Sequence, residues 1–77
     1  MPDPRRDIIQ AVEPGDIAIE IVREKAILLR HKAKSHWLPI SQLGRIEYWN
    51  GNAKYEPAVG DVKSISVARW LVEEKGL

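Results

Sequence analysis

The sequence predicts a mainly β protein of the α+β class, either a small curved antiparallel sheet or an SH3-like or OB-like barrel, with a short C-terminal helix. Three observations predict this fold. Apolar residues alternate with other residues along several short segments, brief breaks separate these segments, and the apolar spacing becomes helical only near the C-terminus. Because 77 residues suffice for one domain with a thin core, we expect a flexible tail over residues 1–7 and a single small domain over residues 8–77.

The first part of the domain contains an ambiguous element followed by a clear turn. Residues 8–12 fit either a short strand or a turn of helix. Residues 13–16 form a turn, because Pro14 fixes one backbone dihedral angle and Gly15 permits a positive φ beside it.

Two strands are expected next. Residues 16–24 alternate with a period of two, which places Ile17, Ile19 and Ile21 on one face. Residues 25–32 carry aliphatic side chains on both faces, as is typical of a central or strongly curled strand. The short break between the two segments predicts an antiparallel hairpin.

A second hairpin is expected around residues 33–35, and its register has two alternatives. A two-residue turn at Ala33 and Lys34 pairs Leu29 with Leu38 and His31 with His36 on the inner face, and Arg30 with Trp37 on the outer face. A three-residue turn sends Trp37 inward beside Leu29 instead, because a one-residue slip exchanges the faces.

The next segments combine a short helical turn with a hairpin. Pro39 ends its strand or lies at an edge, and residues 40–43 resemble one helical or 3₁₀ turn that ends at Gly44. Residues 45–49 resume the alternation of a strand. Asn50-Gly51 then predicts a type I′ hairpin turn, in which both central residues need a positive φ.

The remaining residues predict a loop, a strand and a helix. Residues 52–61 read as a short arm and a loop, and residues 62–67 as a last strand with Ile65 and Val67 inward. Residues 68–75 change to helical spacing, and Gly76 occupies the position of a C-cap glycine.

Composition narrows the class of protein. The chain has no cysteine, which argues against a disulfide scaffold and favours a cytoplasmic protein. The N-terminal residues do not have the pattern of a signal peptide, and no apolar run reaches membrane-spanning length.

Residue types that carry chemistry are sparse. Ser35, His36 and the serines of the last strand lack the partners of a nucleophilic site, so we expect no enzymatic activity. The two histidines have no third ligand fixed by spacing, so we expect neither a metal nor another cofactor.

One group of residues does suggest binding. Residues 25–45 contain several Lys and Arg and no acid, although the net charge of the chain is only +1. Cations beside aromatic rings are typical of single-strand nucleic-acid binding, and they equally suit a protein interface. The candidate partner-binding residues are Arg30, Lys32, Lys34, Arg45, Trp49 and Tyr55. We assign Trp49 to contact because it adjoins a hairpin tip, and Trp37 to the fold.

The segments "WLPISQL" at residues 37–43 and "ARWLVEEKGL" at residues 68–77 carry a resemblance. Together they resemble a Trp-Leu-Pro-x-Ser-Gln and Trp-Leu-x-Glu-Lys-Gly-Leu pattern of small uncharacterised bacterial and phage β-barrel proteins, over about residues 17–77. The resemblance implies a fold and a phage or mobile-element context, and no active site. Small phage proteins of this size often act by binding, and some of them are anti-CRISPR proteins.

These observations lead to one leading hypothesis and two alternatives. The leading hypothesis is a non-enzymatic protein that binds a nucleic acid or a nucleoprotein complex. The first alternative is an inhibitor that binds a protein of a host defence nuclease complex, as anti-CRISPR proteins do. The second is a structural homo-oligomer, such as a dimer, which would supplement a thin core.

Overall fold

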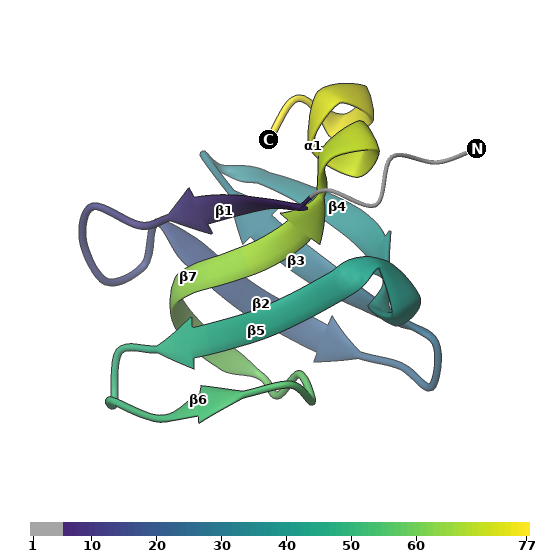
Figure 1. The fold of residues 1–77 in the computed structure, drawn as a ribbon. Coiled ribbons are helices and arrows are strands. Elements are labelled where there is room, and N and C mark those ends of the chain that lie inside the picture. Colours follow the sequence, from purple (N-terminus) through teal and green to yellow (C-terminus); the bar gives the residue numbers. More distant parts are fainter. Residues whose placement is uncertain (1–5) are drawn as a thin grey trace.

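The computed structural model describes residues 6–77 as an antiparallel sheet with one short helix at its end (Figure 1). The elements are β1 (Arg6–Gln10), β2 (Ile17–Val22), β3 (Ala26–His31), β4 (Lys34–Pro39), the 3₁₀ helix η1 (Ile40–Gln42), β5 (Leu43–Tyr48), β6 (Ala53–Lys54), β7 (Gly60–Ala68) and α1 (Arg69–Lys75). The predicted mainly β fold with a short C-terminal helix is therefore confirmed.

The long strand β7 joins the parts of the sheet. The strand order is β4-β3-β2-β7-β5-β6, and β1 also pairs with β7. The first residues of β7 pair with β2, and its later residues pair with β1, while β5 pairs with β7 as well. Among the described residues, no pairing joins β4 to β6, so the sheet is curved but not closed. Of the two predicted forms, the curved sheet is the one observed.

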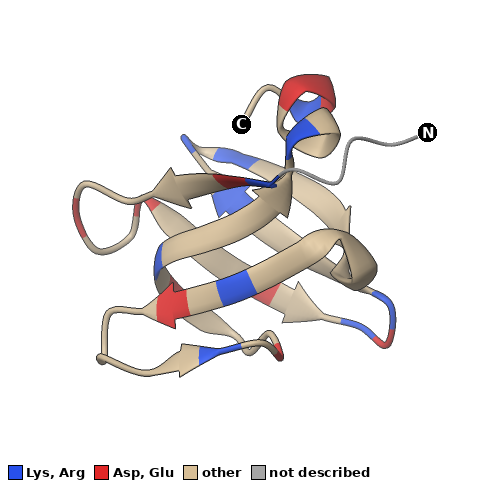
Figure 2. Ribbon diagram, viewed as in Figure 1, with Lys and Arg blue, Asp and Glu red and all other residues tan. Residues whose placement is uncertain are grey.

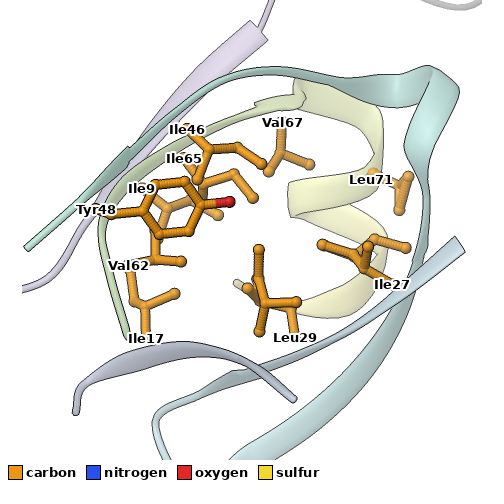
Figure 3. Close-up of a cluster of buried hydrophobic side chains, with 12 residues drawn as sticks. Ile9, Ile17, Ile27, Leu29, Ile46, Tyr48, Val62, Ile65, Val67 and Leu71 are labelled. Atoms are coloured by element: carbon orange, nitrogen blue, oxygen red, sulfur yellow. The ribbon is translucent and has the colours of Figure 1, made fainter. Parts of the chain in front are cut away.

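The core lies inside this curve, where side chains of the strands and of α1 meet (Figure 3). Its fully buried members are Ile17, Ile19, Ile27, Leu29, Leu38, Ile46, Val62, Ile65, Val67 and Leu71. The helix contributes Leu71, and Gly76 ends the helix with a φ of 69°, as the C-cap prediction requires. The inward placement of Ile65 and Val67 is also confirmed.

Strand β1 resolves the ambiguity over residues 8–12 in favour of a strand. It begins at Arg6, two residues before the expected start of the domain at residue 8. The other residues of the predicted tail, 1–5, lie outside the described residues. The predicted turn over residues 13–16 is present: Gly15 has a φ of 96°, and the Asp16 N–H donates to the Glu13 carbonyl at 3.2 Å.

The predicted face of Ile21 is wrong because β2 contains a bulge. Ile19 pairs with Leu29, whereas Ile21 pairs with Leu28, so the register shifts by one residue between them. An extra residue in one strand reverses which side chains point inward. After the bulge, Val22 packs against the core and Ile21 does not.

The predicted pairing of the β3–β4 hairpin is also wrong, although its faces are correct. The turn residues are Lys32 and Ala33, so His31 pairs with Lys34 and Leu29 with His36. The turn thus lies one residue earlier than expected, which moves every pair along the strands without exchanging the faces.

Two predictions around β5 need correction. Gly51 has a φ of 89° and its N–H donates to the Tyr48 carbonyl at 3.0 Å, but Asn50 has no positive φ, so this turn is not type I′. Gly44 lies within β5 rather than ending η1. A Cβ atom at Gly44 would be 3.0 Å from the Cβ and Oγ of Ser66, so a glycine permits the close approach of β5 to β7.

Candidate nucleic-acid interface

The candidate binding residues form two separate groups. Arg30, Lys32 and Lys34 belong to the β3–β4 hairpin, whose tip lies near β1 and α1. Lys and Arg positions mark this tip in blue in Figure 2. Arg45, Trp49 and Tyr55 belong to β5 and the β5–β6 arm, whose tip lies well away from the β3–β4 tip (Figure 1). The fold therefore does not gather the predicted residues on one surface.

An unusual turn holds the basic tip. Lys32 has a φ of 53° and Ala33 a φ of 64°, and they are the only non-glycine residues with positive φ among residues 6–77. Two successive residues in this region are the mark of a type I′ hairpin turn, which usually carries Asn and Gly. This turn presents Lys32 and Lys34 to solvent, because the side chains on both sides of Ala33 are exposed.

The outer face of this hairpin carries the exposed ring of Trp37. Its side chain is 46% exposed and lies opposite Leu28. Arg30 lies opposite Ser35 on the same face, so the guanidinium and the indole ring belong to diagonal neighbours on adjacent strands. The assignment of Trp37 to the core was therefore wrong.

The sequence contained a signal for the exposure of Trp37. Its neighbour Leu38 is fully buried, and successive side chains of a strand point to opposite faces. Once Leu38 is placed inward, Trp37 points outward whatever the pairing of the two strands. Leu28 and Ile21, both half-buried, extend an apolar strip from Trp37 across β3 and β2.

Polar contacts support the same face. The Ser35 hydroxyl donates to Glu20 Oε1 at 2.7 Å, which joins β4 to β2 across β3. Arg30 Nη2 donates to the Gly15 carbonyl at 3.5 Å, so its guanidinium lies near the β1–β2 loop. The hairpin is thus tied to its neighbours on the side that carries Trp37.

His31 lies buried on the inner side of the basic tip. Burial, together with the charges of Lys32 and His36, lowers the pKa of His31, and the nearby Asp16 carboxylate acts in the opposite direction. The imidazole is therefore neutral at neutral pH, and the positive charge of the tip comes from Lys and Arg.

The aromatic arm offers less free surface than expected. Trp49 is half-buried, and Lys63 Nζ lies 5.8 Å from the centroid of its ring. Its Nε1 is buried and has no hydrogen-bond partner among the described residues. Arg45 forms an ion pair with Glu47 at 3.7 Å, whereas Tyr55 is 78% exposed. Only Tyr55 of this group presents a free ring.

Two adjoining hollows flank the basic tip on its other side. One of about 470 Å³ lies between the β1–β2 loop and the hairpin. The second, of about 440 Å³, lies between β1, the hairpin tip and the C-terminal residues. Gln10, His31 and Lys32 line both of them.

The described residues contain no group of three His, Cys, Asp or Glu side chains that could hold a metal ion. Within residues 6–77, no helix has the length and apolar character needed to cross a membrane. Comparisons with protein-family models, with curated proteins and with solved structures found no match to this chain.

Proposed function

We propose that this chain is a non-enzymatic binding protein that contacts single-stranded nucleic acid, alone or in a nucleoprotein complex, through the outer face of the β3–β4 hairpin. The observation that carries the proposal is the exposed ring of Trp37 beside Arg30 on a strand face that ends in a basic turn. The phage or mobile-element context implied by the resemblance belongs to the same proposal.

Each part of this face has a role in the proposed complex. A base stacks on the Trp37 ring, because every base presents a π face and such a stack contributes about 1–3 kcal/mol. Arg30, Lys32 and Lys34 attract the phosphates that follow along the strand. A single strand fits better than a duplex, because the bases of a duplex are stacked on one another and are not free for the indole.

Binding of a fluorescently labelled oligothymidine, followed by anisotropy at increasing salt, tests the proposal. Lys32→Glu with Lys34→Glu is expected to weaken binding more than tenfold and to flatten the salt dependence by about one unit of the log–log slope. Trp37→Ala is expected to weaken binding by roughly five-fold to a hundred-fold through the loss of stacking.

Matched variants separate this surface from general charge attraction. Arg23→Glu with Lys25→Glu makes the same change in charge at the opposite end of β2 and β3, where both side chains are exposed. Tyr55→Ala removes an exposed ring from the distant arm. If these controls weaken binding as much as the hairpin variants do, the proposed surface is wrong.

A protein target is the second candidate function, because Tyr55 and Val59 are both strongly exposed on the loop between β6 and β7. Tyrosine is enriched among the residues that dominate protein interfaces. In this case Tyr55→Ala abolishes capture of a nuclease-treated host partner at high salt, whereas Trp37→Ala leaves that capture unchanged. The anti-CRISPR type of inhibitor belongs to this candidate.

A further inference from the structure

Strand β1 has one paired edge and one free edge. The Ala11 N–H donates to the Lys63 carbonyl at 2.8 Å, in register with the pair Ile9 and Ile65. In antiparallel pairs the hydrogen-bonded residues alternate along the strand. The backbone groups of Ile9 and Ala11 therefore point to β7, and those of Ile8 and Gln10 point to the other edge.

The free edge is accessible and carries apolar side chains. None of the described residues hydrogen-bonds to the backbone of Ile8 or Gln10 along this edge. The side chain of Ile8 is 66% exposed, and that of Val12, just after the strand, is 91% exposed. An unprotected edge strand of this kind is a template for pairing with another extended chain.

The hollows described above lie directly along this edge. Ile8 and Gln10 line the hollow of about 440 Å³, and Gln10 and Val12 line the one of about 470 Å³. Lys32 forms the opposite wall of both hollows. A strand added to β1 would thus run past the basic tip of the β3–β4 hairpin.

The charges around the hollows select the occupant. Asp7 is already paired with Arg69 at 3.1 Å, and Asp16 Oδ2 accepts hydrogen bonds from the N–H groups of Val12 and Glu13. No described acid forms an ion pair with Lys32 or Arg30. The uncompensated charge is therefore positive, which favours an acidic segment. A second copy of this chain would bring two basic tips together and is disfavoured.

We infer that the free edge of β1 binds an extended, acidic peptide segment, which adds to the sheet as a further strand with its carboxylates against Lys32 and Arg30. The backbone of Ile8 and Gln10 supplies the pairing, and Ile8 and Val12 contact its apolar side chains. This inference is independent of nucleic-acid binding, because it uses a different side of the hairpin from the Trp37 face.

Amide hydrogen exchange with synthetic peptides tests the inference. The probe is a peptide in which Glu and Val alternate, and its controls are a Lys–Val peptide and an N-methylated Glu–Val peptide that cannot pair. The acidic peptide is expected to slow exchange at Ile8 and Gln10 at least about tenfold, as occurs when a free amide enters a ladder. Neither control peptide should do so.

Variants of the edge complete the test. Gln10→Pro removes an N–H that points away from β7, a substitution that edge strands tolerate, and is expected to weaken binding at least tenfold. Gln10→Ala changes only the side chain and should bind normally. Lys32→Glu should weaken the acidic peptide and strengthen the Lys–Val peptide. If Gln10→Pro does not fold, the N-methylated peptide still distinguishes strand pairing from simple charge attraction.

Several results would overturn the inference. Equal binding of the Lys–Val peptide excludes charge selection, and equal binding of the N-methylated peptide excludes strand addition. Protection of Ile8 and Gln10 that grows with protein concentration, without peptide, assigns the edge to a second copy. Protection of the same amides by oligothymidine assigns it to nucleic acid. Loss of oligothymidine binding in Trp37→Ala, with peptide binding unchanged, keeps the two proposals separate.

Discussion

Replacement of Ala33 by glycine is expected to stabilise the protein. Ala33 has a φ of 64°, and this left-handed conformation costs an L-residue with a Cβ atom about 1–2 kcal/mol. Glycine avoids this cost but loses about 0.5–1 kcal/mol more conformational freedom on folding. Because the Ala33 side chain is exposed, no core packing is lost. The net gain in the free energy of unfolding for Ala33→Gly is therefore about 0.5–1 kcal/mol.

Urea unfolding followed by tryptophan fluorescence measures this gain. With a slope of about 1 kcal/mol per molar urea for so small a protein, the midpoint should rise by about 0.5–1 M at an unchanged slope. Ala53→Gly is the matched control, because Ala53 is exposed in β6 and has no positive φ. The same substitution there should lower the midpoint by a similar amount.

The sign of the change is the decisive result. If Ala33→Gly lowers the midpoint as Ala53→Gly does, Ala33 is not held at positive φ, and the turn of the β3–β4 hairpin lies elsewhere. The register in which His31 pairs with Lys34 would then be wrong as well. A midpoint that rises together with a changed slope would instead indicate an altered unfolded state.

Three further outcomes are expected. The lowered pKa of His31 means that the unfolded chain binds more protons below its ordinary pKa of about 6.5, so stability present above that pH falls as acid is added; His31→Gln should flatten this dependence in urea midpoints measured from neutral to acidic pH. Gly44→Ala should cost about 1–3 kcal/mol by crowding Ser66, and Ser66→Gly in the same chain should restore much of the loss in thermal unfolding. Trp49→Phe removes a buried N–H without a partner, so its unfolding free energy should change by less than about 1 kcal/mol, and a larger loss would show that the N–H is bonded.

The faces of the strands could be predicted more easily than their partners. Placing Leu29 and Leu38 inward requires only that side chains alternate, and both are fully buried. Pairing them requires the position of the turn, which depends on which residues accept positive φ. Lys32 and Ala33 are not residues that usually do so, and no glycine or asparagine in residues 31–35 marked the turn.

The bulge in β2 was beyond the reach of the sequence pattern. Residues 17–22 alternate without interruption, and the extra residue appears only when β2 pairs with β3. Curvature of the sheet is the property that a bulge supplies, and it depends on contacts between strands distant from one another. For this reason Ile17 and Ile19 were placed correctly, whereas Ile21 was not.

The candidate site shows the same difference between local and long-range information. The basic residues of the hairpin could be identified from composition, and their exposure follows from the turn. The two tryptophans were assigned in the reverse of their observed exposure, because a position beside a hairpin tip does not determine burial. Trp49 is half-buried beneath Lys63, a residue of β7, whereas Trp37 lies outward on β4.

The strained turn connects stability with both proposed surfaces. Lys32 lies at positive φ, where Asn or Gly would cost less, and its side chain stands between the Trp37 face and the hollows along β1. Lys32→Asn should therefore stabilise the fold while weakening the oligonucleotide and the acidic peptide. Ala33→Gly relieves strain in the same turn and removes no charge, so it should leave both affinities intact. Such a contrast would mean that the lysine is kept at this position for binding, at a cost in stability.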